Sequence, residues 1–342
     1  MLKKIKILIK KNHFTYFILK RFINILKFYI GTISRNRSLF SINNFSNKHK
    51  NVFILDTRIH SIIFDSVVLL IRGSNFFYND KWTLIIYEDD FHRYASKVVN
   101  DEIYFSSLIN IFLQSLLILP NPPIYIKFIN NSYELLEIIK KTKKMFPENY
   151  NFLDNKKTYL IRNFNEKDFE NFKINKPILK ATKYYSEIFE KYLNYRNINE
   201  YITITIRTKN WSTGDWNTDV EDIKLYIDFI KKNNLKNHEI IIIPDTQQDV
   251  PKEIIEIFKN NSLRYHLFHH GSFSIPMRFL AYSKASFNLS SSNGPSILLS
   301  FIENNSFLIL KDPHQDNDYI KFVNKYNKDI FLNRKIIFYK KY

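Results

Sequence analysis

The chain has 342 residues, of which 45% are hydrophobic and 16% aromatic, and this composition predicts a folded protein long enough for two domains. It contains no cysteine, which excludes disulfides, thiolate metal sites and cysteine nucleophiles. Lys, Asn, Ile, Phe and Tyr abound while only 5 glycines occur, a bias typical of an AT-rich genome. Part of the formal net charge of +18 therefore reflects codon usage.

The positive charge is concentrated at the start of the chain. Residues 1–50 contain 12 Lys or Arg and no acid, so they contribute +12 of the +18 and leave +6 for the remainder. Nucleic-acid binding would need a basic stripe on the folded part or an RNA-binding motif, and the sequence has neither. We therefore expect no nucleic-acid partner, with binding through this arm as the remaining alternative.

Residues 13–30 follow a helical period in which Lys20, Arg21 and Lys27 interrupt an apolar run. These charges disfavour a bilayer span, and no small-residue cleavage site follows, which disfavours a signal peptide. The pattern favours a basic amphipathic helix lying on an anionic membrane surface through residues 1–30. Packing of this helix on the protein's own body is the alternative.

Strands and helices are predicted to alternate after residue 50. In the first half we expect strands at 52–56, 82–87, 124–129 and 158–164, with helices at 61–73, 102–119 and 132–146. After a linking region at 176–197, we expect strands at 201–207, 238–246, 263–269, 286–290 and 306–311. Helices are expected between them at 218–232, 249–261, 274–285 and 294–305, the first opened by a capping box of Thr218 and Glu221.

This alternation predicts two tandem Rossmann-like, doubly wound α/β domains with parallel sheets. The expected boundaries are a basic arm at 1–50, an N-terminal domain at 51–170 and a C-terminal domain at 171–342. In open parallel sheets, ligands bind at the carboxyl ends of the strands. The functional residues should accordingly follow the strands.

Polar residues and glycines do follow four strands of the second domain. Arg207 ends the first strand and precedes Gly214 and Asp215. Asp245 ends the second strand, and the third is followed by His269, His270 and Gly271.

The fourth strand runs into the segment SSSNGPS, residues 290–296. Ser292 or Asn293 would cap a helix beginning near Pro295, and Gly294 would let a ligand approach its N-terminus closely. The hydroxyls of Ser290, Ser291, Ser292 and Ser296 could then donate to phosphate or sugar oxygens. A helix cap alone is the simpler interpretation.

Several signatures are absent from the sequence. It has no HExxH, GxSxG, P-loop or GxGxxG motif, which disfavours a dinucleotide dehydrogenase. Asp316–Asn317–Asp318 has the DxD form of a metal–nucleotide site, but it follows the last expected strand in a polar segment, so we expect solvated surface and no metal site.

Three segments carry a resemblance to GT-B glycosyltransferases, particularly fucosyltransferase-like and bacterial surface-polysaccharide enzymes. They are ITIR at 204–207, IIIPDT at 241–246 and SSSNGPSILLSF at 290–301, while LPNPPIYIKF at 119–128 is similar in the first half. The fucosyltransferase pattern has a histidine two residues before the arginine, where this chain has Thr205.

The resemblance implies a nucleotide-sugar donor held in the C-terminal domain. Arg207 would neutralise the departing diphosphate, and Asp245 would contact the nucleotide or order its loop. The other donor-binding residues implied are His270, Ser291, Ser292, Asn293 and Gly294. A general base would come from the N-terminal domain, with Asp56 and Asp89 as the leading candidates beside His60 and Asp90. No metal or other cofactor would be needed, because arginine and a helix terminus supply positive charge.

The expected function is thus transfer of a sugar to a glycan or lipid-linked acceptor in surface-polysaccharide synthesis, by a peripheral enzyme at the cytoplasmic face of the cell membrane. One alternative is a polysaccharide pyruvyltransferase-like enzyme, which would use Arg207 and the serine-rich turn for an enolpyruvate donor. Another is a non-catalytic, membrane-associated scaffold of the same fold.

Overall fold

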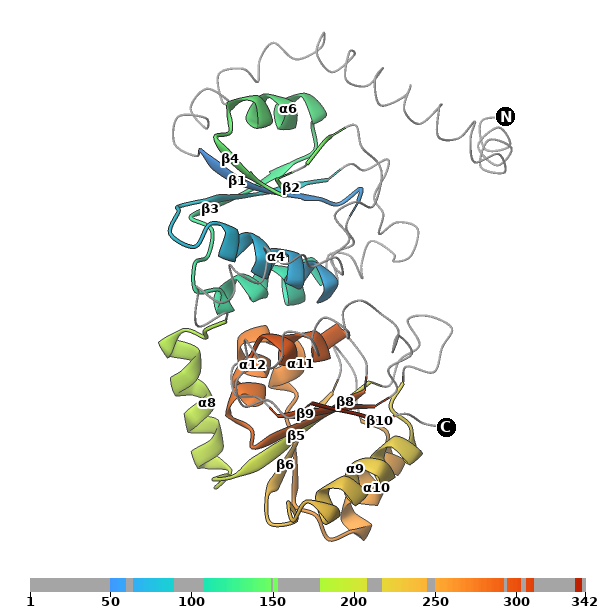
Figure 1. The fold of residues 1–342 in the computed structure, drawn as a ribbon. Coiled ribbons are helices and arrows are strands. Elements are labelled where there is room, and N and C mark those ends of the chain that lie inside the picture. The colour runs from blue at the N-terminus through green and yellow to red at the C-terminus, as the bar shows by residue number, and fades with distance from the viewer. Residues whose placement is uncertain are drawn as a thin grey trace, which may run out of the picture. The chain divides into compact units, whose positions relative to one another are not determined.

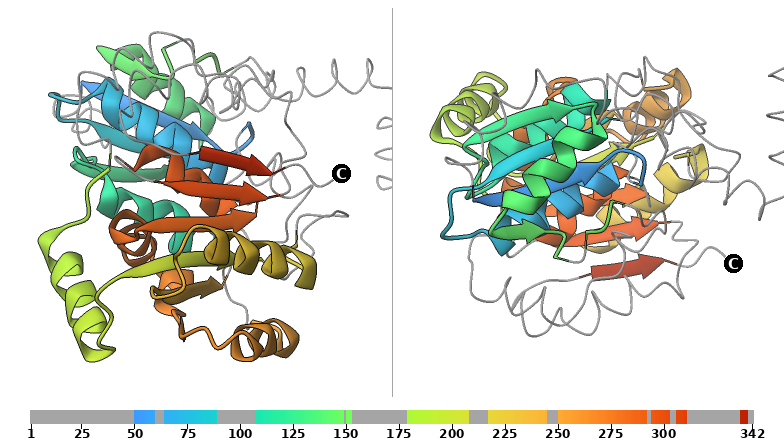
Figure 2. Two further views of the ribbon diagram at one scale, coloured as in Figure 1. Left: turned by 60° about the horizontal axis from the view of Figure 1, so that its bottom comes forward. Right: turned by 90° about the horizontal axis from the view of Figure 1, so that it is seen from above.

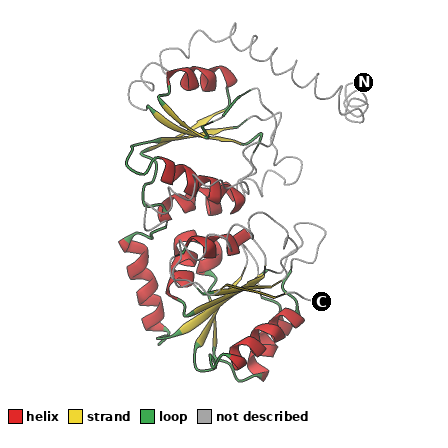
Figure 3. Cartoon of the chain, in the orientation of Figure 1, coloured by secondary structure: helices red, strands yellow, loops and turns green. Residues whose placement is uncertain are grey.

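The computed structural model describes residues 50–59, 64–88, 107–148, 150–152, 179–207, 217–244, 250–291, 294–302, 306–310 and 336–339 (Figure 3). The predicted N-terminal helix and the strand expected at 158–164 lie outside these residues. Within the described part of the chain, no helix combines the length and apolar character that crossing a bilayer requires.

Two compact units make up the chain, and they interleave along the sequence. The first comprises 1–61, 79–98 and 123–159, and the second comprises 62–78, 99–122 and 160–342. The helix α4 (Phe64–Phe76) and two short helical segments, η2 (Leu108–Leu113) and η3 (Leu116–Ile118), therefore group with the second unit. A sequential division at residue 170 does not anticipate this exchange.

The described strands of the first unit form one parallel sheet in the order β3-β2-β1-β4 (Figure 1). They are β1 (Asn51–Asp56), β2 (Thr83–Tyr87), β3 (Tyr125–Ile129) and β4 (Lys144–Phe146). The helix α6 (Ser132–Lys141) covers one face and packs Leu135 and Ile138 onto Val52, Ile54 and Ile85. Its first turn is capped by Asn131, whose side chain accepts from the backbone N–H of Tyr133.

The described strands of the second unit form a parallel sheet in the order β10-β9-β8-β5-β6-β7, and Figure 2 shows its strands running in one direction. They are β5 (Tyr201–Ile206), β6 (Glu239–Pro244), β7 (Tyr265–Leu267), β8 (Phe287–Ser291), β9 (Phe307–Leu310) and β10 (Ile336–Tyr339). The chain builds outward from β5 through β6 to β7, then crosses to β8 on the other side. The order of strands consequently reverses between β5 and β8.

Helices lie on both faces of the second sheet. The helices α9 (Val220–Lys232) and α10 (Lys252–Asn260) cover one face, where their apolar side chains meet Ile202, Ile204 and Ile206. On the other face lie α11 (His270–Phe273), α12 (Ile275–Lys284) and η4 (Gly294–Phe301), a 3₁₀-helix. The helix α8 (Lys183–Tyr195) precedes β5 and packs against α12.

The prediction of a mixed α/β chain with parallel sheets is confirmed, but several elements differ. Residues 144–146, expected at the end of a helix, form β4, because Thr142 leaves the helical conformation and the chain pairs with β1. The apolar segment expected as one long helix is helical throughout its described part, 107–118, but it includes a π-helical stretch, η2, and ends in a 3₁₀ turn, η3. The strand β10 was not predicted.

Two fully buried tyrosines of the second unit differ in how their hydroxyls are satisfied. Tyr201 donates to the carbonyl of Ala281 at 3.0 Å, whereas the hydroxyl of Tyr226 has no hydrogen-bond partner among the described residues. Burial raises the pKa of both, and the nearby Asp222 carboxylate raises that of Tyr226 further. At a pH where these two tyrosines begin to lose their protons in the unfolded chain, both are still neutral in the folded protein.

These contacts predict opposite effects of two identical substitutions. Tyr201→Phe should lower the free energy of unfolding at pH 7 by about 1 kcal/mol, while Tyr226→Phe should leave it unchanged or raise it. Both folded-state pKa values lie above the ordinary value of about 10. The free energy of unfolding should therefore fall as the pH rises above 10, and Tyr226→Phe should make this fall smaller. Urea unfolding at pH 7 and pH 10.5 measures both effects; equal losses at pH 7 would contradict this account.

Candidate functional site

Three residues meet where the strand order of the second sheet reverses. Arg207 directly follows β5 and Ser291 ends β8, the neighbouring strand across the reversal. The Thr218 hydroxyl accepts from the backbone N–H of Arg207 at 3.0 Å and lies 3.3 Å from the hydroxyl of Ser291. The backbone N–H of Thr218 donates to the carbonyl of Arg207 at 2.7 Å. We call this arrangement the Arg207–Thr218–Ser291 clasp, and it lies where ligands bind in open α/β sheets.

The helix that follows the clasp does not offer a positive N-terminus. Asp219 caps α9 and forms a reciprocal capping box with Asp222, at 2.8 and 3.0 Å, so the expected box of Thr218 and Glu221 is wrong by one residue. Thr218 does not cap the helix; its hydroxyl instead contacts Arg207 and Ser291 in the clasp. With acids at Asp219, Glu221 and Asp222, the first turn already carries negative charge. An anion at this edge would need a positive charge from another source.

The serine run has a different structure from the turn that the sequence suggested. Ser290 and Ser291 belong to β8 and are fully buried, with Ser290 donating to the carbonyl of Ser291 at 2.9 Å. Two of the four expected hydroxyls therefore lie in the strand, while Ser292 and Asn293 are outside the described residues. Ser296 is buried in the first turn of η4.

Gly294 has a packing role that the sequence did not reveal. A Cβ added at this position would lie 2.9 Å from Cβ of Phe64, the first residue of α4. Such a contact is shorter than van der Waals packing allows, so glycine permits α4 and η4 to meet. This packing accounts for Gly294 without any ligand.

The other predicted donor-binding residues are only partly described. Asp245 follows β6 but lies outside the described residues, as do Gly214 and Asp215. His270 is the first residue of α11, where it is exposed, with its ring centroid 5.9 Å from that of Phe268. The adjacent Gly271 lies against Phe268 and Ile243, which an added Cβ would approach to 2.9 and 3.0 Å.

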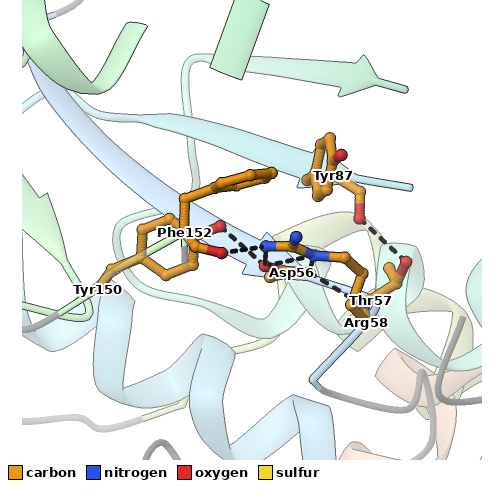
Figure 4. Close-up of polar contacts among 6 residues, drawn as sticks. All are labelled: Asp56, Thr57, Arg58, Tyr87, Tyr150 and Phe152. Atoms are coloured by element: carbon orange, nitrogen blue, oxygen red, sulfur yellow. Dashed lines mark hydrogen bonds and ion pairs between the residues drawn. The ribbon is translucent and has the colours of Figure 1, made fainter. Parts of the chain in front are cut away.

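In the first unit, Asp56 lies in a buried cluster at the carboxyl end of β1 (Figure 4). Arg58 donates to both Asp56 oxygens, with its Nη2 2.6 Å from Oδ2, and Tyr150 donates to the same oxygen at 2.8 Å. Arg58 also donates to the Phe152 carbonyl at 3.1 Å and lies over the Phe152 ring. Burial and the Asp56 charge raise the pKa of Tyr150, which keeps its proton on the hydrogen bond.

The contacts of this cluster favour a structural role for Asp56, which ties the end of β1 to residues 150–152, over a role as a catalytic base. Both Asp56 oxygens accept hydrogen bonds from Arg58, and the Asp56 side chain is about 1% exposed. A base must reach the proton it removes, and this carboxylate is closed to solvent. The other candidates, His60, Asp89 and Asp90, lie outside the described residues.

A buried polar network on the α12 face of the second sheet was missed by the sequence reasoning. Thr203 contacts the side-chain oxygen of Asn288, and Thr205 shares a hydrogen bond of 2.8 Å with Tyr282. Tyr282 in turn lies 3.5 Å from the guanidinium of Arg278. The signal was available in YITITI, whose threonines alternate with isoleucines and so mark a polar inner face of a central strand.

No group of three or more His, Asp or Glu residues among those described is arranged to hold a metal ion. The expectation that function needs no metal stays a prediction.

The clasp predicts that the hydroxyl of Thr218 stabilises the fold. Thr218→Val should lower the free energy of unfolding by about 1–3 kcal/mol, because the partly buried backbone N–H of Arg207 loses its acceptor, and Thr218→Ser should restore most of it. Thr83→Val is the matched control, since the buried Thr83 hydroxyl has no partner among the described residues and its loss should be neutral. Urea unfolding that gives equal effects at both positions would refute the role of the clasp.

A second prediction concerns the cluster of Figure 4. Asp56→Asn should lower the free energy of unfolding by about 3–5 kcal/mol, because Arg58 is left as a buried charge without its carboxylate. The double variant Asp56→Leu/Arg58→Met removes both charges and should recover part of that loss. Calorimetry of the three proteins measures these differences. An Asp56→Asn protein as stable as the original chain would show that the ion pair is not structural.

No protein-family model matches the sequence, and no curated protein matches it. Among solved structures, one similar chain is the glycosyl transferase family 9 protein from Veillonella parvula, with TM-score 0.44, 9% identity, and coverage of 85% of this chain and 86% of that one. POFUT1 in complex with GDP gives a TM-score of 0.40 at 7% identity, covering 75% and 95%. The E. coli heptosyltransferase WaaC with ADP gives 0.37 at 10%, covering 82% and 99%. The structural neighbours are thus glycosyltransferases, at low identity and low TM-score.

Proposed function

We propose that this protein is a glycosyltransferase of GT-B type that binds the diphosphate of a nucleotide-sugar donor at the carboxyl edge of the second sheet. The observation that carries the proposal is the clasp, which fixes the backbone of Arg207 where the strand order reverses. Arg207 is also the residue that the sequence resemblance assigns to the donor diphosphate.

Arg207 is suited to a diphosphate by its chemistry. Its planar guanidinium can donate two parallel hydrogen bonds to phosphate oxygens, whereas lysine offers only a point charge. The acidic first turn of α9 leaves the positive charge to come from side chains rather than from that helix terminus. In this proposal Arg207 stabilises the charge that develops as the nucleoside diphosphate leaves.

The remaining donor contacts would come from the loops beside the clasp. We assign Ser292 and Asn293 to the phosphates or donor sugar through hydroxyl and backbone N–H groups, and Asp245 to the nucleotide. Ser291 would act through the clasp, because its side chain is buried against Thr218. His270 is exposed at the start of α11 and remains a candidate for ligand contact.

The general base is assigned to Asp89, because Asp56 is closed off in its ion pair. The acceptor is proposed to be a glycan or a lipid-linked intermediate of surface-polysaccharide synthesis. Residues 1–30 would hold the enzyme at the anionic inner face of the cell membrane, where lipid-linked acceptors reside.

A thermal-shift screen against ADP, GDP, UDP and CMP and their sugar conjugates, with EDTA or Mg²⁺, tests the donor site. One nucleotide at about 100 times its Kd should stabilise the folded protein by about 2.7 kcal/mol, with or without Mg²⁺. Arg207→Ala should weaken its binding about 10–100-fold, because a hydrogen-bonded ionic contact is lost.

Arg264→Ala is the control for the change of net charge, because Arg264 is exposed just before β7, at the opposite edge of the same sheet. It should leave nucleotide binding unchanged. Stabilisation by phosphoenolpyruvate alone would favour the pyruvyltransferase-like alternative. No response to any of these ligands would contradict the proposed donor site.

A further inference from the structure

Arg278, on α12, is a fully buried arginine held by neutral oxygens. Its Nε donates to the carbonyl of Gly271 at 2.6 Å, and its Nη2 donates to the carbonyl of Pro244 at 3.0 Å. Its Nη1 lies 3.5 Å from the Tyr282 hydroxyl, and its Cζ lies 6.0 Å from the ring centroid of Phe64. Arginine is charged at all relevant pH values, so a full positive charge lies inside the second unit.

This charge has no anionic partner among the residues that the structure describes. Arg278 contacts two carbonyls, one hydroxyl and one aromatic ring. Buried arginines are normally paired with a carboxylate, because an uncompensated charge in the interior is strongly unfavourable. Two carbonyls and a hydroxyl could equally be served by a neutral donor, so the hydrogen bonds alone do not explain the charge.

The contacts of Arg278 place it at the same edge of the sheet as the clasp. Pro244 ends β6, and Gly271 follows β7 in the first turn of α11, so both accepting carbonyls lie at the carboxyl edge. Through Tyr282 the network reaches Thr205, which lies two residues before Arg207 on β5. Phe64, beside the guanidinium, is also the residue that packs against Gly294 at the start of η4.

We propose that Arg278 is a positioning residue that supplies a fixed, buried positive charge to the donor site, and that the diphosphate of the ligand is its counter-charge. The inference rests on the proposed function and adds that the second unit selects its ligand by the negative charge of the diphosphate. Arg278 does not touch the ligand. It acts through the weakly screening interior between the guanidinium and the carboxyl edge, where charges interact more strongly than in water.

The test compares ligands that differ in charge. Binding of the nucleoside diphosphate that stabilises the protein most is measured by calorimetry at low salt, together with the corresponding nucleoside and inorganic pyrophosphate. Arg278→Met keeps the bulk of the side chain and removes the charge. It should weaken the diphosphate and pyrophosphate about tenfold or more, and the uncharged nucleoside much less.

Two variants separate charge from geometry. Arg278→Lys keeps the charge but not the planar fork, so it should retain most of the preference for the diphosphate over the nucleoside even if its melting temperature falls. Arg264→Met removes one exposed positive charge at the opposite edge of the sheet and should change none of the three affinities. Circular dichroism and melting curves of each variant establish that it is folded before binding is measured.

The outcomes are distinct. Equal weakening of nucleoside and diphosphate by Arg278→Met, or Arg278→Lys behaving like Arg278→Met, would overturn the electrostatic role and leave Arg278 as a brace for the carbonyls of Pro244 and Gly271. Failure of the unaltered protein to bind any nucleoside diphosphate would instead contradict the proposed donor site itself. If Arg278→Met does not fold, Arg278→Lys still decides the question, since loss of its diphosphate preference would overturn the inference.

Discussion

The pair of backbone and hydroxyl hydrogen bonds between Arg207 and Thr218 is the constraint on which the candidate site depends. It holds the end of β5 against Thr218, the residue before the N-cap of α9. The third member, Ser291, ties the same point to β8 across the reversal of strand order. Because the backbone of Arg207 is held in this way, ligand binding has to order only its side chain.

Beneath the clasp, the second sheet has two chemically different faces. The isoleucines of β5 meet the apolar side chains of α9 and α10, whereas its threonines meet Asn288 and Tyr282. The apolar face supplies most of the burial energy, and the polar face fixes geometry, because each hydroxyl and amide there must find a partner in a weakly screening interior. Arg278 belongs to that polar face and places a buried positive charge near the carboxyl edge of the sheet.

The alternation of strands and helices was predictable because β-branched runs and helical periods are local properties of the sequence. Other features depend on partners far away in the chain. Thr218 fits a helix-cap pattern in the sequence, but its hydroxyl accepts a hydrogen bond from the backbone N–H of Arg207. The close approach of Gly294 to Phe64 could not be predicted from the sequence either. Residues 144–146 continue a helical pattern, yet pairing with β1 makes them a strand. Arg278 fits a solvent-facing helix position equally well by sequence, and only the packing of α11, α12 and β6 shows that it is buried.

Amide hydrogen exchange with and without the nucleoside diphosphate that stabilises the protein most would test the central claim most directly. Protection on binding is predicted to concentrate in peptides covering the ends of β5 and β8, around residues 205–207 and 290–296, and in the segment leading to Thr218. Peptides at the amino edge of the same sheet, around residues 261–266, should not change. Protection at that amino edge, or protection confined to the first unit, would contradict a donor site at the clasp.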